Sequence, residues 1–444
     1  MAVDKLVDST QLNADLTSVA NAIRTKGGTS AQMAFPAGFV SAVEAIPTGG
    51  GGEEAPFNDV NFYDYDGKIV ASYTKAEFLA LDALPSNPSH SGLVAQGWNW
   101  TLAGAKSYVT KYGFLDIGQS YITSDGATRV KIAVYQDYEQ PFKLYWTQNK
   151  ANGVTIDWGD GSPTETASGS GTGGQNKSHT YTGKGIYTIS MMPDDDCDFW
   201  LGNRGNLAIW GAGNAGYGFS TKIIGVNIGK NYPELGGGPV FGSCYACNEV
   251  TIPRSCTTLN SVIGDALSAN GVVIIPYGVT EISVNSFCGP RGKKAICIPE
   301  TLQDITGATF AYNQLNINRV CIPDAQTSIP QSMFTNMHVL QQVAIPSGIT
   351  SIGSSAFANA YSLNSFIVPA GVTSIGATAF QFFRGSEIVM LPTVPPTIES
   401  STFSNLLSET IIYVPYSADH SVLNAYTSAT NWSALASRIQ EMSA

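Results

Sequence analysis

The composition is that of a folded chain with little charge. Among its 444 residues, 23 Lys and Arg stand against 34 Asp and Glu, which gives a net charge of −11 and a charged fraction of 13 %. A typical globular protein has about 25 % charged residues, and the hydrophobic fraction of 43 % excludes a disordered chain. The acidic balance also excludes a nucleic-acid binder of the usual kind, which needs a basic surface. The 46 Gly and 22 Pro predict many turns and a mainly β fold.

The start of the chain has no visible targeting segment. Asp4, Lys5 and Asp8 occupy the place where an export signal has an apolar stretch. No apolar run approaches the roughly 20 residues that span a bilayer. We therefore expect a protein made in the cytoplasm, with no signal peptide and no membrane insertion. The seven Cys lack the spacing of a disulfide framework, which fits folding in a reducing compartment.

Residues 1–46 are predicted to form a helical hairpin, which a Gly-rich linker over 47–56 follows. A segment this small rarely builds a stable core alone. We expect it to attach the chain to a larger assembly or to other copies in a homo-oligomer such as a trimer. The alternative is packing on the next domain, but four consecutive glycines favour independent motion. The predicted anchor residues share helical spacing and an apolar character: Leu12, Leu16, Val19, Ile23, Phe39 and Val43.

Residues 57–128 are predicted to form a small α+β module. The turn Asp66-Gly67 lies between two apolar runs and indicates a β-hairpin. Trp98 and Trp100 form a cluster of a kind that can serve as a platform for sugars. We expect them in the core instead, because aromatic side chains dominate protein cores.

Residues 129–193 have the alternating pattern of strands with one buried face. Thr155 to Ser162, together with His179-Thr180-Tyr181 and Gly185-Ile186-Tyr187, resembles the PKD family of immunoglobulin-like β-sandwiches. The resemblance implies that Trp158 and both Tyr are core or corner residues and that Gly-Asp-Gly is a turn. His179 and Asp160 are interpreted as structural residues, since no base–nucleophile pair accompanies them.

A repeat follows residue 225. A hydrophobic residue before Pro occurs eight times at steps of 23 or 24 residues. A second anchor follows seven residues later in seven copies, and a Phe follows after twelve in six copies. Fixed periods of 20–29 residues indicate a solenoid. Each copy should supply a short strand that ends at Pro and stacks in parallel on the next, about 4.8 Å away. The first anchors are Ile252, Ile275, Ile298, Ile322, Ile345, Val368, Leu391 and Val414.

The motif Val372-Thr373-Ser374-Ile375-Gly376 followed by Ala379-Phe380 resembles the BspA-like leucine-rich repeats. The resemblance implies a solenoid over 222–444 that binds a protein or a glycan and has no activity of its own. The segment after Tyr416 is predicted to be a helical cap on the last copy. The expected fold is therefore multidomain and mainly β: a helical hairpin, an α+β module, a PKD-like sandwich and a capped repeat solenoid.

One column of the repeat is unusually apolar. The residues just before the first anchors should point outward, where a solvated ladder would be polar. We hypothesise that a partner, a sister subunit or the upstream domain covers this candidate interaction face; the alternative is cover by short flanking loops. The column reads Thr251, Ile274, Cys297, Cys321, Ala344, Ile367, Met390 and Tyr413.

Two further clusters are expected to have no chemistry. Cys244 and Cys247 fall at core positions of a repeat copy, and neither a second Cys pair nor a His completes a zinc site. The acidic run Asp194 to Asp198 lacks a calcium-loop pattern and reads as a solvated loop. Without a catalytic arrangement we expect no enzyme, no cofactor and no metal.

The order of the parts favours an attachment protein. Asp15 to Arg24 and Phe35 to Phe39 resemble the openings of virion-associated proteins of phages that infect gut bacteria, and Val60 to Trp100 resembles the module that follows. The resemblance implies a tail or head fibre or receptor-binding component, located in the virion and attached to other virion proteins through residues 1–46. The alternatives are a bacterial cell-surface adhesin, which predicts an export signal, and a polysaccharide-degrading enzyme, which requires clustered carboxylates.

Overall fold

The computed structural model describes residues 58–134, 142–201, 223–231, 249–259, 272–283, 295–307 and 317–443. The chain divides into two compact units, Met1–Glu54 and Ala55–Ala444. The predicted anchor hairpin, its linker and the Cys244-Cys247 pair lie outside the described residues. Within the described part of the chain, no helix is long and apolar enough to cross a bilayer.

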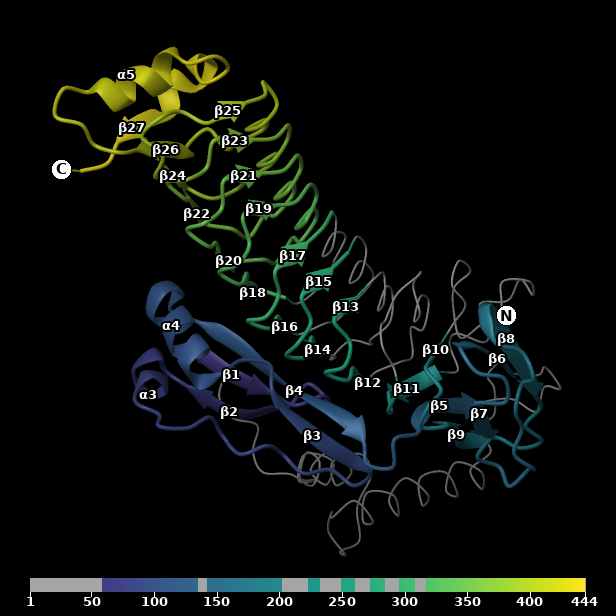
Figure 1. Ribbon diagram of the computed structural model, residues 1–444. Helices are drawn as coiled ribbons and strands as arrows, with labels where there is room; N and C mark the ends of the chain where they lie inside the picture. The colour runs from purple at the N-terminus through teal and green to yellow at the C-terminus, as the bar shows by residue number, and fades with distance from the viewer. Residues whose placement is uncertain are drawn as a thin grey trace, which may run out of the picture. The chain divides into compact units, whose positions relative to one another are not determined.

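The first described part is a four-stranded sheet with two helices (Figure 1). The sheet has the order β2-β1-β4-β3, with β1 parallel to β4 and the other neighbours antiparallel. The predicted hairpin is present, and Gly67 in its turn has a φ of 86° that favours glycine. The elements are β1 (Val60–Tyr63), β2 (Ile69–Tyr73), α3 (Lys75–Leu79), β3 (Leu93–Trp98), α4 (Leu102–Tyr112) and β4 (Leu115–Thr123).

Two further sheets follow and share one core. One has the order β10-β6-β8 and the other β12-β11-β5-β9-β7. Trp146 and Trp158 are fully buried, and the hydroxyl of Tyr181 donates a hydrogen bond to the Trp158 carbonyl at 2.8 Å. The strands are β5 (Thr128–Val134), β6 (Phe142–Gln148), β7 (Val154–Asp157), β8 (Gly171–His179), β9 (Gly185–Pro193), β10 (Phe199–Leu201), β11 (Ile223–Asn227) and β12 (Val250–Thr251).

The second of these sheets runs directly into the repeats. Strand β11 pairs antiparallel with β5 on one side and parallel with β12 on the other. Strands β10 and β11 thus lie beyond residue 193, where the sequence analysis ended the sandwich. The sheet therefore continues into the solenoid, because β12 pairs in parallel, as the repeat strands do.

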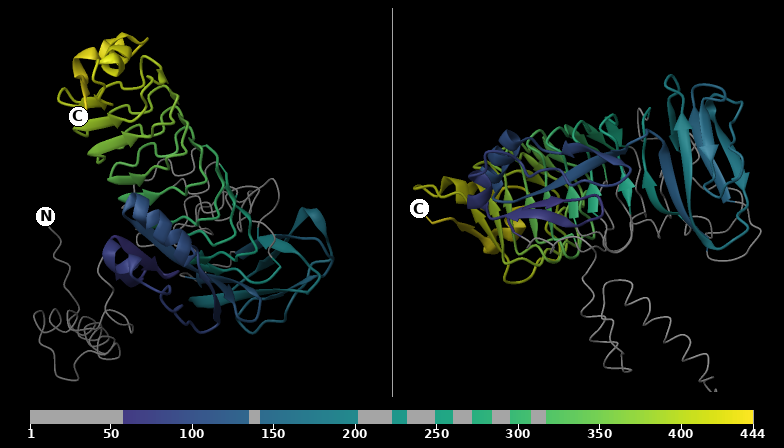
Figure 2. Two further views of the ribbon diagram at one scale, coloured as in Figure 1. Left: turned by 60° about the vertical axis from the view of Figure 1, so that its left-hand side comes forward. Right: turned by 90° about the horizontal axis from the view of Figure 1, so that it is seen from below.

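The repeats form a β-solenoid with two columns of parallel strands (Figures 1 and 2). In the described residues the first column, whose strands lie just before the repeated Pro, contains β14 (Val272–Ile274), β16 (Ala295–Cys297), β18 (Arg319–Cys321), β20 (Gln342–Ala344), β22 (Ser365–Val368), β24 (Glu387–Met390) and β26 (Ile411–Val414). The other column contains β13 (Thr258–Leu259), β15 (Glu281–Ile282), β17 (Asp304–Ile305), β19 (Ser328–Ile329), β21 (Ser351–Ile352), β23 (Ser374–Ile375) and β25 (Thr397–Ile398). No copy buries its own face, so stacking creates the core.

The predicted Phe anchors form a stack inside the solenoid. Consecutive ring centroids lie 5.2, 5.5 and 5.5 Å apart, with interplanar angles of 21°, 10° and 7°. Each of these rings is at most 5 % exposed. The ring separation is close to the spacing of neighbouring strands, so one Phe fills the space under each strand. The rings belong to Phe334, Phe357, Phe380 and Phe403.

The predicted register is wrong in one strand. Met390 pairs with Val368, and both side chains are fully buried, whereas Leu391 is 40 % exposed. Phe380 precedes Ile388 by eight residues, while Phe357 precedes Phe366 by nine, so one residue is missing before β24. The segment between Met390 and Ile398 is one residue longer than in the preceding copy, so Ile398 is again at its expected position. Met390 is therefore a core residue and does not belong to the outward column.

The end of the solenoid is closed as predicted, with one added strand. Helix α5 (Ser421–Ser428) and the 3-10 helix η2 (Ser433–Arg438) are followed by β27 (Ile439–Glu441), which pairs parallel with β26. The Trp432 ring lies 5.4 Å from that of Phe403 and thus ends the Phe stack. Its indole nitrogen donates a hydrogen bond to the Pro396 carbonyl at 2.7 Å, so the buried N–H is satisfied.

Candidate functional site

The upstream α+β module lies on the first part of the apolar outward column. Strand β4 runs beside β12, β14, β16 and β18. As a result Ile274, Cys297, Cys321 and Ala344 are at most 9 % exposed. Gly118 permits this approach, because a Cβ atom there would lie 2.7 Å from Ile274 Cγ2. Within this part of the column, the upstream module supplies the cover.

Thr251 begins the same column and is 3 % exposed. Its hydroxyl accepts a hydrogen bond from the Ile228 amide at 3.1 Å. The two Cys of the column are apolar core groups, since burial raises the pKa of Cys321 to about 12 and raises that of Cys297 well above its usual value. Such thiols remain protonated and are poor nucleophiles.

Polar side chains of the module donate to the solenoid, one repeat copy after another. The Asn99 amide donates to the Ile275 carbonyl at 3.0 Å and the Trp100 indole to the Ile298 carbonyl at 2.7 Å. The Tyr108 hydroxyl donates to the Ile322 carbonyl at 2.8 Å. All three acceptors belong to the residue before the repeated Pro. These bonds satisfy buried carbonyls that would otherwise destabilise the fold. Trp100 is thus a core residue, as predicted.

A buried ion pair fixes the module on β18. Arg319 Nε donates to Asp116 Oδ2 at 2.9 Å, Nη2 donates to the other carboxylate oxygen, and Nη1 donates to the Asn58 carbonyl at 3.0 Å. The side chains of the pair are 6 % and 2 % exposed. Burial alone would lower the pKa of Arg319, but the Asp116 carboxylate outweighs it and raises the pKa. The guanidinium therefore remains charged inside the interface.

Beyond the module the outward column is open. Ile367 is 56 % exposed, and Val389 and Tyr413 are half-buried. Val389 takes the place that the sequence analysis gave to Met390, because β24 pairs one residue earlier than expected. The apolar face that the module covers thus continues without cover over three more strands.

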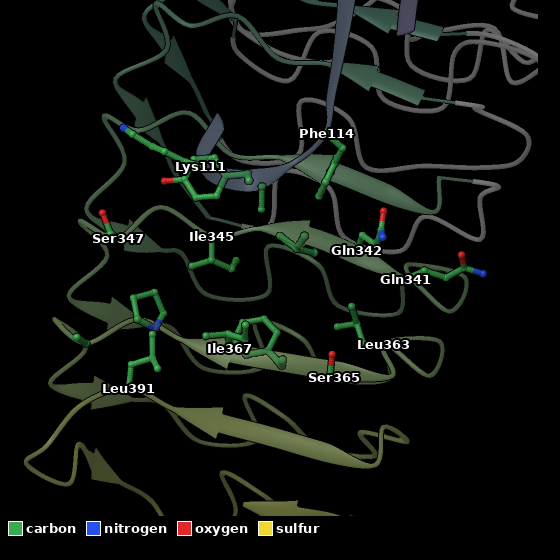
Figure 3. Close-up of a pocket in the computed structure, with 16 residues that line it drawn as sticks. Lys111, Phe114, Gln341, Gln342, Ile345, Ser347, Leu363, Ser365, Ile367 and Leu391 are labelled. Carbon is green, nitrogen blue, oxygen red and sulfur yellow. The ribbon is translucent and has the colours of Figure 1, made fainter. Parts of the chain in front are cut away.

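A pocket lies where the module ends and this open face begins (Figure 3). Its volume is about 510 Å³, within the range of ligand sites. Tyr112 and Phe114 of the module line one side, and Ile345, Ile367 and Leu391 of three successive copies line the other. Figure 3 shows these three side chains: Ile367 lies in β22, and Ile345 and Leu391 directly follow β20 and β24. The lining is mainly apolar, which is typical of sites that bind a ligand.

Two of the polar side chains that line the pocket, Lys111 and Tyr112, are already paired. Lys111 forms an ion pair with Asp324, and the Tyr112 hydroxyl donates to Asp324 Oδ1 at 2.6 Å. Burial and this carboxylate raise the pKa of Tyr112. Sequence reasoning did not find the pocket, because its two sides lie far apart in the chain. The only available signal was the apolar outward column that contains Ile367.

The acidic loop is neutralised by lysines. Lys150 Nζ lies 2.8 Å from an Asp194 carboxylate oxygen and 2.6 Å from one of Asp196, and Asp195 pairs with Lys230. Three carboxylates of the loop thus have lysine partners. Across the described ranges, no group of three or more His, Cys, Asp or Glu could hold a metal ion.

Asp160 and His179 form a turn-stabilising pair. His179 Nε2 lies 2.7 Å from Asp160 Oδ2, and the His179 ring stacks on Trp158 with centroids 4.8 Å apart. The second Asp160 oxygen accepts from the Ser162 amide at 3.0 Å. Both side chains are therefore engaged in holding the Gly-Asp-Gly-Ser turn against the sheet.

This pair makes the stability of the fold depend on pH. Burial raises the pKa of Asp160, but hydrogen bonds from Ser162 and His179 outweigh burial and hold the pKa at about 2. A carboxyl whose pKa falls on folding stabilises the fold above its usual value near 4, and this contribution is lost as the pH falls toward 2. We expect Asp160→Asn to cost about 1–2 kcal/mol at pH 5 and less at pH 2. Urea titrations of both proteins at the two pH values measure this; an equal cost at both would contradict it.

The repeats can be compared with known proteins. Residues 266–386 and 350–436 match the BspA type leucine rich repeat region, in six copies. This stretch carries BspA-type leucine-rich repeats. No curated protein matches the chain.

Three solved structures show likeness to this chain. A leucine-rich cell surface protein from Faecalibacterium prausnitzii is 22 % identical, with a TM-score of 0.27 over 47 % of this chain and 63 % of that one. The pneumococcal vaccine antigen PcpA is 14 % identical, with a TM-score of 0.27 over 47 % and 65 %. A leucine-rich repeat protein from Bacteroides ovatus is 14 % identical, with a TM-score of 0.22 over 49 % and 77 %. The match spans less than two thirds of the first two proteins.

Proposed function

We propose that this chain is a non-enzymatic adhesion protein that binds a bacterial surface protein or glycan through its repeat solenoid. The observation that carries the proposal is the apolar outward face, which continues past the α+β module and opens into the pocket around Ile367. An exposed apolar patch next to a well-formed pocket is typical of an interaction site. The module and the solenoid act as one rigid ligand-binding body.

We also propose that residues 1–46 attach this body to a virion, as part of a tail or head fibre, and that the attached form is a homo-oligomer. The resemblance of Asp15 to Arg24 and Phe35 to Phe39 to virion proteins supports this. The chain also divides into two units at Glu54, and residues 1–46 fall within the first unit. The two sheets that follow the module then serve as a PKD-like spacer. Display on a bacterial cell surface is the second candidate and requires the same ligand-binding body.

Deletion of residues 1–46 tests the anchor. We expect the shortened protein to lose oligomerisation and particle incorporation, because the attaching segment is gone. Its melting temperature and its binding to bacterial cells should equal those of the full chain. Light scattering, electron microscopy of particles and sedimentation with labelled cells measure these properties. Intact assembly of the shortened protein would contradict the proposed role of residues 1–46 as an anchor. The adhesion function would be contradicted if the full chain is found on particles but does not sediment with the bacteria that those particles infect.

A further inference from the structure

The module supplies a row of aromatic rings along the solenoid. Trp100 and Tyr108 have ring centroids 5.0 Å apart, and Tyr108 and Tyr112 have centroids 4.5 Å apart. These separations are close to the spacing of about 4.8 Å between stacked strands. The row therefore runs along the solenoid: Trp100 donates to one copy at Ile298, and Tyr108 and Tyr112 donate to the next copy, at Ile322 and Asp324. Trp100 and Tyr108 each donate to the carbonyl before Pro in successive copies, at Ile298 and Ile322.

The row ends at Tyr112, whereas the surface that it contacts continues. Helix α4 stops at Tyr112, with Gly113 in the left-handed conformation at φ 88°, and the Tyr112 hydroxyl turns to Asp324. The next copies still present apolar side chains, with Ile345 and Ile367 lining the pocket. The pocket therefore has the surface chemistry that the module already occupies over the preceding copies.

We propose that this pocket receives a Trp or Tyr side chain of a polypeptide partner, which continues the aromatic row beyond Tyr112 and packs on Ile367. The inference deepens the proposed function, because it names the partner class for the same surface. Three observations support a protein partner. The pocket continues an existing protein–protein type of interface, its volume of about 510 Å³ accommodates an indole with its backbone, and its edge charges Lys111 and Asp324 neutralise one another. Aromatic residues commonly anchor such interfaces.

Ligand-observed saturation-transfer NMR with the full chain tests the inference. The probes are N-acetyl-tryptophanamide, N-acetyl-leucinamide and methyl β-glucoside. We expect strong transfer to the indole protons, little to the leucine analogue and none to the sugar. Ile367→Arg should weaken the binding of the indole probe at least about tenfold, since a charged side chain then enters an apolar site.

The matched control is Ile186→Arg in β9, because Ile186 is 67 % exposed and does not line the pocket. This variant should bind the indole probe like the parent protein. Equal binding of the indole probe by the parent and Ile367→Arg proteins would overturn the inference, and so would a preference for the sugar that Ile367→Arg abolishes. If the Ile367→Arg protein no longer binds the indole probe but still sediments with cells, the pocket binds aromatic side chains and the ligand on the cells binds another surface. If neither variant changes any binding but the cells are still bound, the proposed function stands and this inference fails.

Discussion

Replacement of Phe357 by Ala is expected to lower the free energy of unfolding of the solenoid by about 3–5 kcal/mol. The Phe357 ring is fully buried, with neighbouring centroids at 5.2 Å for Phe334, 5.5 Å for Phe380 and 4.7 Å for Phe366. Its loss leaves a cavity in the middle of the stack. In a repeat array each copy is stabilised mainly by its neighbours, so two interfaces weaken together. Chemical denaturation followed by circular dichroism measures the effect.

Tyr361→Ala in the same copy is the control for Phe357→Ala. Tyr361 is 41 % exposed, so its removal should change the stability by no more than about 0.5 kcal/mol. A near-neutral Phe357→Ala protein would show that the Phe column does not face the core. A Tyr361→Ala protein as unstable as Phe357→Ala would show that the measurement does not distinguish buried from exposed rings.

Asp116→Asn is expected to destabilise the body by about 3–5 kcal/mol, because it leaves the buried Arg319 cation without its carboxylate. Asn retains the size of the side chain, so loss of charge is the main change. The partly freed module should also become a better substrate for a protease. Denaturation curves and limited proteolysis of the junction between β4 and β18 measure the two effects.

The double variant Asp116→Leu/Arg319→Met separates charge from contact. Apolar side chains of similar size often replace a buried ion pair with little loss, so the double variant should recover most of the stability that Asp116→Asn loses. A double variant that is less stable than Asp116→Asn would show that the pair contributes through geometry that apolar residues cannot replace. A near-neutral Asp116→Asn protein would mean that water reaches Arg319.

The repeat was predictable because its signal is local and recurs. The second anchors from Leu259 to Ile398 and the Phe anchors are buried wherever the structure describes them. The exception at Met390 has a simple cause: the Leu391-Pro392 dipeptide matched the pattern, but one residue is missing before β24 and one is added after it. A pattern anchored on Pro cannot detect two shifts that cancel within one copy.

The cover on the outward column was only partly predictable. The sequence showed that Cys297 and Cys321 are too apolar for a solvated ladder, yet it left four possible covers open: a partner, a sister subunit, the upstream domain or short flanking loops. The choice depends on contacts between residues about 200 positions apart, such as Asp116 with Arg319. The spacing of residues in the repeat contains no information about such a contact. The pocket was beyond reach for the same reason, because Phe114 and Ile367 meet only in the folded chain.

The matching of donors to carbonyls limits how the number of repeats can change. The module donates to successive copies at Ile275, Ile298 and Ile322, and the Asn99 amide also donates to the Cys297 carbonyl of the second copy. A duplication or loss of a copy in that stretch would put every later donor opposite the wrong acceptor and would separate Asp116 from Arg319. Among the described residues, the module pairs with no copy after the one that contains Ala344 and Ser347. Gene-level expansion or contraction of the array beyond that copy would therefore leave the module undisturbed. Length variation among related chains should therefore be concentrated between β20 and the terminal cap.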